Sequence, residues 1–304
     1  MPLDVLKEVL AAGGGCAVAD GLLNPLETMK VKLQLQPESP RIYDGMLGGL
    51  SKAVAEDGLL QGLWLPGLAA TFIRSFTYVG FRIGLYPTVK KAVQAKSDGR
   101  DTLAVKILSG CFTGAIGSAL FCPVDVVRLR MQADSGTLGP DGVLVSGLRR
   151  GLPPRYDSTL SAFSSIVRQE GLTKGLYRGA GPTVLRAAVL SGSQLASYDG
   201  LKQVLKGPGS SLPLPPALRE EGPVLHSCCS LTSGLIAQTC IQPFDTTRSV
   251  IMAGHLPIGE SLRRHGPFFL LRGYLTACCR QGPIMLIQMP VVEQLRLLLD
   301  LEPF

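Results

Sequence analysis

A motif that combines a proline, an acid and a base occurs three times along the chain. In each copy the acid follows the proline by two residues and the base follows it by five, at the foot of an apolar segment rich in small residues. The copies begin at Pro25, Pro123 and Pro243, with the acids Glu27, Asp125 and Asp245 and the bases Lys30, Arg128 and Arg248. Self-similarity of this kind is the signature of a repeat architecture. The chain is therefore predicted to be three copies of one unit.

The residue types of the motif predict its local geometry. A proline inside a helix removes one backbone hydrogen bond and clashes with the preceding turn, so it bends the helix. An acid and a base three residues apart leave the bend on one helix face. Three bent helices around an axis would bring three acids and three bases together at one end. The alternative is a solvated charged face at the ends of three separate helices.

A second alignment places one arginine at the same position in each unit. Seven residues after Gly67, Gly179 and Gly273 stand Arg74, Arg186 and Arg280. In a helix that starts at the glycine, each arginine lies about 10 Å inside the helix, and an arginine inside a membrane costs about 2.5 to 3.5 kcal/mol unless it meets water or a partner. The matched trio predicts a shared aqueous cavity. Snorkelling arginines or purely structural ion pairs are the alternative.

Composition limits the classes of protein that fit. Of the 304 residues, 46% are hydrophobic and 17% charged, and the mean hydropathy is +0.26. This composition suits helices that have one face towards lipid and one face towards water. The net charge of +7 is compatible with nucleic acid, anionic lipid or an anionic substrate. Nucleic acid is disfavoured, because the bases are spread through apolar segments. The three histidines have no metal-ligand or triad spacing, so neither an enzyme nor a metal site is predicted.

The pattern Pro-x-acid-x-x-base-x-base-x-Gln, complete in two copies and kept as far as its first base in the third, resembles the mitochondrial carrier family over nearly the whole chain. The resemblance implies an all-α membrane protein with six transmembrane helices, in which three pseudo-symmetric two-helix repeats form a barrel around a central cavity. It implies a multi-pass protein of the mitochondrial inner membrane that acts as a monomer and needs no cofactor. The repeats are expected at residues 6–94, 102–206 and 222–301, with a Pro- and Gly-rich link at 207–221.

Local sequences around the arginines resemble the branch of the family that holds the dicarboxylate and oxoglutarate carriers and the uncoupling proteins. The resemblance implies that small anions (dicarboxylates, keto acids, phosphate or sulfate) are exchanged through the cavity by alternating access. The substrate-binding residues that it implies are Arg74, Arg186, Arg280, Arg82, Gln194 and Asp20. Uncoupling proteins carry an aspartate in an Ala-Asp context like Ala19-Asp20, so proton-coupled anion transport is an alternative to simple exchange. Asp20 could instead pair with Arg82 or another cavity base and balance its charge.

Two gates are implied by the same resemblance. On the matrix side, the acids Glu27, Asp125 and Asp245 are expected to pair with Lys30, Arg128 and Arg248 of neighbouring units, as exposed ion pairs of about 0 to 1 kcal/mol each. For Asp125 the expected partner is Arg248 or Lys30. The gate on the opposite side is expected to use Lys90, Asp199, Lys202, Glu293 and Arg296.

Several positions depart from the family pattern. Pro87 occupies the position at which the family pattern has an acid of the outer gate. In the third copy of the motif, Val250 replaces the second base and Met252 replaces the glutamine. These departures leave open a membrane scaffold or receptor that has the carrier fold but does not transport. Retention of all three arginines argues for transport.

The connection between the two helices of each unit ends in a further motif. Its three copies lie at residues 56–67, 170–179 and 265–273. In the family these segments lie on the matrix side, where the helix that begins at the final glycine offers free N–H groups to cardiolipin or another anionic phospholipid. The third copy has lost its acid and its aromatic residue, which weakens the expectation of lipid binding there.

Overall fold

The structure is a computed structural model, and it describes residues 2–37, 41–96, 102–206, 223–254, 259, 262–263 and 266–301. Within these residues the regular structure is helical apart from one isolated bridge between Leu138 and Leu144. The predicted link at 207–221 lies outside the described residues. The long helices are α1 (Pro2–Leu22), α2 (Asn24–Leu35), α4 (Leu68–Lys96), α5 (Leu103–Leu120), α6 (Cys122–Ala133), α8 (Ala180–Lys206), α9 (Pro223–Ala253) and α11 (Tyr274–Leu298).

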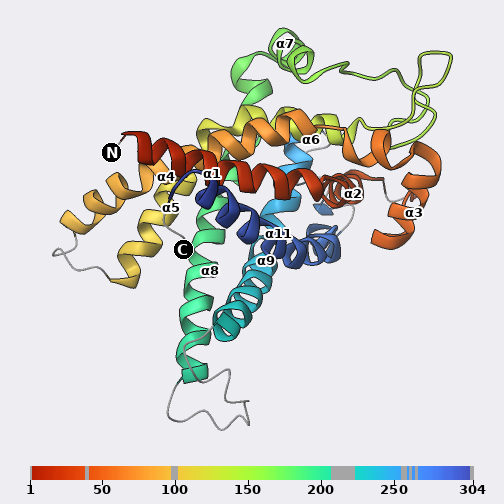
Figure 1. Ribbon diagram of the computed structural model, residues 1–304. Coiled ribbons are helices and arrows are strands. Elements are labelled where there is room, and N and C mark those ends of the chain that lie inside the picture. The colour runs from red at the N-terminus through yellow and green to blue at the C-terminus, as the bar shows by residue number, and fades with distance from the viewer. Residues whose placement is uncertain are drawn as a thin grey trace.

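Figure 1 shows how these helices are arranged, and six of them close into a ring through their mutual contacts. Around it α1 packs on α4, α4 on α5, α5 on α8, α8 on α9, α9 on α11, and α11 again on α1. Small residues allow the closest approaches. A Cβ built on Gly15 of α1 would lie 2.2 Å from a side-chain carbon of Val292 on α11, so no larger residue fits there without a shift. The ring leaves a space at its centre into which side chains of all three repeats can point.

The shorter helices lie outside the ring at one end of it. They are α3 (Gly45–Asp57) and α7 (Thr159–Glu170), which follow α2 and α6 in the chain. Each is followed by one turn of π-helix, Leu60–Trp64 and Leu172–Leu176, and the third repeat has a 3₁₀ turn, Pro267–Leu271. Buried apolar side chains of α2, α6, α7 and α9 form one cluster at this end, including Val31, Val126, Ile166 and Val250.

The prolines of the repeated motif bend the first two helices as predicted. The axis turns by 62° between Leu6–Leu22 and Asn24–Leu35, and by 64° between Ala104–Leu120 and Cys122–Ala133. Pro25 and Pro123 lie in the first turn of the new helix, where a missing N–H breaks no helical hydrogen bond. The break is not repeated in the third unit, because α9 continues through Pro243 as one helix. A bend of α9 at Pro243 stays a prediction.

The second helix of each unit begins one residue after the predicted glycine. Gly67, Gly179 and Gly273 have φ values of +68°, +83° and +74°, a conformation that glycine adopts without steric cost. Each glycine also meets a motif helix of another unit. A Cβ on Gly67 would lie 3.1 Å from the carbonyl oxygen of Arg128, for example. The three glycines therefore set where the helices start and how near the units come to one another.

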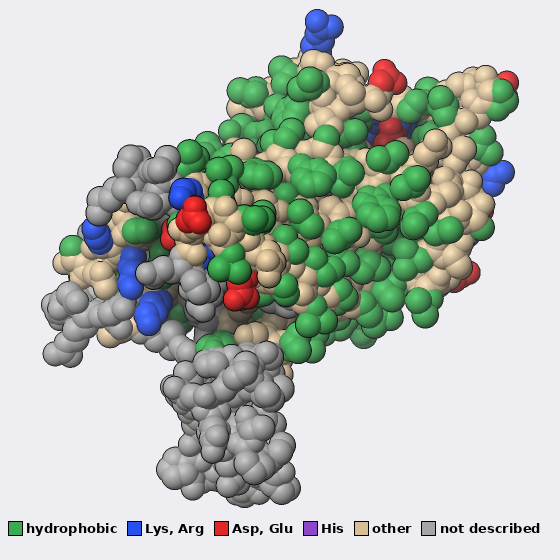
Figure 2. Space-filling model, viewed as in Figure 1, with side chains coloured by type: hydrophobic (Ala, Val, Ile, Leu, Met, Phe, Trp, Pro, Cys, Tyr) green, Lys and Arg blue, Asp and Glu red, His purple; other side chains and the backbone are tan. Residues whose placement is uncertain are grey.

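The outer surface is strongly apolar. Figure 2 shows a face with hydrophobic side chains across its middle, where Lys, Arg, Asp and Glu side chains lie mainly towards the ends. Large hydrophobic residues are exposed on the ring helices, for example Val18, Phe112, Ile116 and Leu235. Among the described residues no single helix is both long and apolar enough to cross a membrane by itself, whereas the two bent pairs, α1 with α2 and α5 with α6, meet those criteria together.

Candidate functional site

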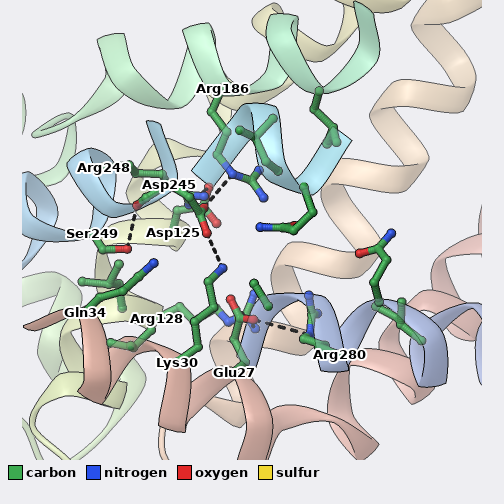
Figure 3. A pocket seen from close by; sticks show the side chains of 18 of the residues that line it. Glu27, Lys30, Gln34, Asp125, Arg128, Arg186, Asp245, Arg248, Ser249 and Arg280 are labelled. Atoms are coloured by element: carbon green, nitrogen blue, oxygen red, sulfur yellow. Dashed lines mark hydrogen bonds and ion pairs between the residues drawn. The ribbon is translucent and has the colours of Figure 1, made fainter. Parts of the chain in front are cut away.

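A cavity of about 250 Å³ lies inside the ring and receives side chains from all three repeats (Figure 3). Arg74, Arg186 and Arg280, from α4, α8 and α11, all line it, together with Gln194. The structure therefore brings together residues of all three repeats, which lie far apart in the chain. The charged residues along the cavity wall are Lys30, Arg74, Arg128, Arg186, Arg248 and Arg280 with Glu27, Asp125 and Asp245.

The acids and bases of the repeated motif pair between units. Arg248 contacts Asp125 at 2.6 Å, and Arg128 lies 4.0 Å from Glu27. Lys30 pairs with Asp245. Each base thus reaches the acid of the preceding unit around the ring, and of the two partners considered for Asp125 the structure has Arg248. We call these three contacts the motif pairs.

Each acid of a motif pair also contacts one of the three cavity arginines. Arg186 Nε donates to Asp245 at 2.7 Å, Arg74 pairs with Asp125, and Arg280 Nε lies 3.4 Å from Glu27. Figure 3 shows Lys30 and Arg186 reaching Asp245 from two sides. Because the cavity arginine and the motif base come from different repeats, every carboxylate joins its own repeat to both of the others. No motif in the sequence indicates this double role of the arginines.

The motif pairs are buried, which corrects the expectation of exposed pairs. The carboxylate side chains of Asp125, Asp245 and Glu27 are only 4%, 5% and 17% exposed. Their burial follows from the convergence of α2, α6 and α9 at one end of the ring. Removing one partner of a buried pair leaves an uncompensated charge and typically costs about 3 to 5 kcal/mol. These contacts can therefore separate only if another group takes the place of the one that leaves.

Asp20 on α1 pairs with a cavity base, although not with Arg82. One carboxylate oxygen contacts Arg280, and the other accepts a hydrogen bond of 2.9 Å from the hydroxyl of Ser75. Arg280 therefore lies between two acids, Asp20 and Glu27. Arg82, on α4, makes no ion pair or hydrogen bond with any residue that the structure describes.

A further set of contacts ties two of the motif helices to the outer helices. Arg130 donates two hydrogen bonds to Glu170, at 2.5 and 2.8 Å, and these bonds lower the pKa of the Glu170 carboxyl. In the first repeat, Lys32 lies 3.5 Å from Asp57 and donates to the carbonyl of Gly62 at 3.2 Å. These pairs were not among the contacts expected from the sequence. Internal alignment could have found them, because the third repeat has lost the second base and the acid together.

The departures in the third motif have a packing role. Val250 and Met252, in place of the second base and the glutamine, are 3% and 0% exposed and belong to the apolar cluster. In the other two motifs the glutamine reaches a different repeat: Gln34 donates to Thr246 at 3.4 Å and Gln132 to Asn24 at 3.1 Å. At the equivalent place Met252 packs beside Gly179. The third repeat thus replaces polar contacts by apolar ones.

The structure places the residues of the predicted outer gate less completely than those of the motif pairs. Lys90 lies on α4, and Glu293 and Arg296 lie on α11, and none of them is among the described residues that line the cavity. The side chains of Asp199 and Lys202 lie outside the described part of the chain. Pairing among these five residues stays a prediction.

Comparison with known protein families shows the same threefold repeat that the motif indicates. The family model described as mitochondrial carrier protein matches the chain three times, at residues 2–97, 99–209 and 219–302, which confirms the repeat. Mitochondrial uncoupling protein 1 of Arabidopsis thaliana is 33% identical over 308 residues, covering 96% of this chain and 93% of the relative. Mitochondrial substrate carrier family protein ucpB of Dictyostelium discoideum is 29% identical (97% and 96% covered). The human putative mitochondrial transporter UCP3 is 28% identical (97% and 93% covered).

Proposed function

Since the chain belongs to the mitochondrial carrier family, whose members are membrane transport proteins, we propose that it exchanges small anions across the mitochondrial inner membrane. In this proposal a single chain crosses the membrane with six helices, and its central cavity opens alternately to the two sides. The anions are dicarboxylates, keto acids, phosphate or sulfate.

The observation that carries this proposal is the excess of positive charge in the cavity. Seven bases (Lys30, Arg74, Arg82, Arg128, Arg186, Arg248 and Arg280) face four acids (Asp20, Glu27, Asp125 and Asp245), which leaves a formal charge of +3. Six of the seven bases are arginines, whose planar guanidinium groups match carboxylate and phosphate oxygens. An anion entering the cavity would meet charge that the protein does not compensate.

The double pairing of the acids suggests how binding and gating are coupled. An anion bound to Arg74, Arg186 and Arg280 competes with Asp125, Asp245 and Glu27 for the same guanidinium groups. Each acid would then keep only its motif base, and the motif pairs, acting as a matrix gate, would loosen. Because the anion replaces a carboxylate at each arginine, the arginines are not left unpaired, as a buried charge requires. The outer gate of Lys90, Asp199, Lys202, Glu293 and Arg296 would form as the matrix gate opens.

A thermal-shift screen of the purified protein tests this proposal, because a ligand that binds only the folded state raises its stability. The panel contains succinate, oxoglutarate, phosphate, sulfate and ATP. At least one of the small dianions is expected to raise the melting temperature of the parent protein, and Arg74→Ala is expected to lose that shift. Arg168→Ala, which removes an exposed arginine from α7, is the control. No stabilisation by any of the anions would contradict the proposal and favour the scaffold alternative.

Proton-coupled transport, the alternative raised by Asp20, has less support. The carboxylate of Asp20 has partners for both oxygens, Arg280 and Ser75, within the cavity wall. Charge balance for Arg280 accounts for its position, and proton carriage is not needed to explain it.

Anionic phospholipid is the second proposed partner. A hollow of about 290 Å³ lies where α11 begins at Gly273, and Arg41 and Arg272 are among the residues that line it. The free N–H groups of the helix start favour an anion, and the hydroxyl of Thr276 in the same wall is buried without a hydrogen-bond partner. The third copy of the lipid motif, for which the sequence raised the weakest expectation, thus has features that support lipid binding.

A further inference from the structure

A second hollow, of about 270 Å³, lies at the end of the ring where the motif helices end. Leu35, Ala133 and Ala253 line it, and each stands five residues after the motif base of its own repeat, or about 7.5 Å further along the helix. The rest of its wall comes mainly from the long connection between α6 and α7, residues 134–158. This end pocket therefore lies just beyond the motif pairs, and it shares no lining residue with the central cavity.

The long connection is fixed to the first repeat, so it gives the end pocket a firm outer wall. The backbone N–H and the hydroxyl of Thr137 donate to the carboxylate of Asp57 at 3.2 and 3.1 Å, and the hydroxyl of Ser146 donates to the same oxygen. Leu148 packs both on the apolar cluster of the motif helices and on a smaller cluster around Met29 in the first repeat. All three repeats thus take part in building the pocket.

The polar part of the end pocket is basic. Arg130, Arg149 and Arg155 line it, and Asp134 is the one acid among the described lining residues. Both carboxylate oxygens of Asp134 are in use, because one contacts the guanidinium group of Arg149 and the other accepts a hydrogen bond of 2.7 Å from the backbone N–H of Arg155. Arg130 is paired with Glu170. The charge of Arg155 is therefore left uncompensated at the pocket.

Two of these arginines have donor groups to offer a ligand. In the part of the chain that the structure describes, the guanidinium group of Arg155 makes no hydrogen bond or ion pair, and that of Arg149 uses a single nitrogen. Guanidinium groups match the oxygens of phosphate and carboxylate. The remaining wall is apolar and includes Leu35, Leu148 and Leu152. The pocket thus suits an anionic group that is joined to an apolar one.

We propose that the end pocket binds a soluble phosphate monoester with a small apolar body, and that this ligand holds the ring closed at the motif pairs. The three terminal oxygens of the phosphate group accept hydrogen bonds from Arg149 and Arg155, and the apolar body lies against the leucines. A soluble ester is favoured over a lipid headgroup of the same chemistry, because the ends of the three motif helices surround the pocket.

The effect on the ring follows from the position of the ligand. It touches the ends of α2, α6 and α9, which have to separate when the motif pairs open. A ligand that binds the closed arrangement better than the open one shifts the population towards the closed arrangement. This control of exchange rests on the proposed function, whereas binding in the end pocket does not.

Calorimetric titration in detergent tests the binding, with phenyl phosphate, inorganic phosphate and benzoate as probes. The protein carries Arg186→Ala, so that the central cavity contributes little. Phenyl phosphate is expected to bind more tightly than either of the other probes, since it alone combines the phosphate group with an apolar ring. Adding Arg155→Gln should weaken its binding at least about fivefold, because hydrogen bonds to a charged group are lost.

Two features make Arg155→Gln a clean variant. The side chain is exposed and has no described partner, so the melting temperature without ligand should not fall. Arg150→Gln is the matched control, because it removes the same charge from an exposed neighbour that does not line the end pocket. In proteoliposomes, phenyl phosphate should slow counter-exchange by the parent and by Arg150→Gln, and Arg155→Gln should need at least about fivefold more of it, in line with the weaker binding.

The outcomes separate the end pocket from the proposed function. Equal binding of phenyl phosphate by Arg155→Gln and Arg150→Gln overturns the pocket, whether or not the protein transports. Tighter binding of benzoate overturns the choice of phosphate. Loss of binding in nanodiscs that contain phosphatidate, but not in nanodiscs of phosphatidylcholine alone, assigns the pocket to a lipid headgroup and overturns the soluble ligand. Binding that depends on Arg155 but does not slow exchange overturns the control of the ring. Such binding by a protein that exchanges no anion overturns the proposed function and supports the pocket.

Discussion

Three carboxylates, those of Glu27, Asp125 and Asp245, each accept contacts from one motif base and one cavity arginine. For Asp245 the partners are Lys30 and Arg186, which belong to the two other repeats. A buried acid held on two sides gives up one partner more readily than an acid with a single partner, because the charge that remains is still paired. The residues proposed to bind the anion and those proposed to close the cavity are therefore in direct contact.

Arg186→Ala tests the role of a cavity arginine. The change removes one donor to Asp245, which keeps Lys30 as its partner, so folding should be retained. We expect anion exchange by reconstituted protein to fall at least about a hundredfold, because a charge-assisted contact with substrate is lost. Arg178→Ala, in the second copy of the connecting motif at residues 170–179, removes a partly exposed arginine as a control. Exchange at the parent rate in Arg186→Ala would exclude this arginine from the binding site.

Asp20→Asn tests whether the carboxylate of Asp20 carries protons. Since it pairs with Arg280, we expect the substitution to lower the exchange rate by disturbing that arginine while the response to a pH gradient stays as in the parent. The measurement is anion uptake into liposomes with and without an imposed gradient. A response present in the parent and absent in Asp20→Asn would establish the proton role instead.

At the scale of elements, the outer helices are joined to the motif helices by Lys32–Asp57 and Arg130–Glu170. Alignment of the three units could predict which helices exist, where the second helix of each unit starts, and that motif pairs form between units. It could not predict the double pairing of the acids, because this depends on how α4, α8 and α11, which carry the three cavity arginines, are rotated about their own axes.

Glu170 gives a pH dependence of known sign. The hydrogen bonds from Arg130 lower its pKa from the ordinary value of 4.5, so the pair contributes fully to stability above that value and loses its contribution as the pH falls through the folded-state pKa. We expect the melting temperature of the parent to fall more steeply between pH 5 and pH 3, on the order of the acidic range of a carboxyl group, than that of Glu170→Gln. Parallel curves for the two proteins would show that the pair does not stabilise the fold.

A charge exchange tests the motif pairs as contacts between elements. Asp125→Arg and Arg248→Asp should each impair transport, and combining them should restore part of it, since the ion pair between α6 and α9 is rebuilt in reverse. Recovery should be incomplete, because Arg74 would then face an arginine. Combining Asp125→Arg with Lys30→Asp should not restore transport, as Lys30 contacts Asp245. Equal recovery in both combinations would argue against this assignment of partners.

For the whole molecule, three similar units build a site that is not symmetric. The apolar outer surface suits a lipid environment, and the ring encloses a cavity whose wall carries more bases than acids. Loss of the second base and the glutamine in the third unit leaves its packing intact, since Val250 and Met252 fill the space. The departures from the repeat are therefore compatible with a complete ring and a working cavity.

Counter-exchange in proteoliposomes tests the central claim most directly. Vesicles containing the purified protein are loaded either with unlabelled succinate, oxoglutarate, phosphate or sulfate or with buffer alone, and uptake of the corresponding labelled anion is followed. The account predicts rapid uptake of at least one anion into vesicles loaded with that anion, little uptake into vesicles loaded with buffer, and loss of uptake in Arg186→Ala. Absence of uptake for every anion, with correctly inserted protein, would contradict it, as would uptake that is independent of the internal anion and of Arg186.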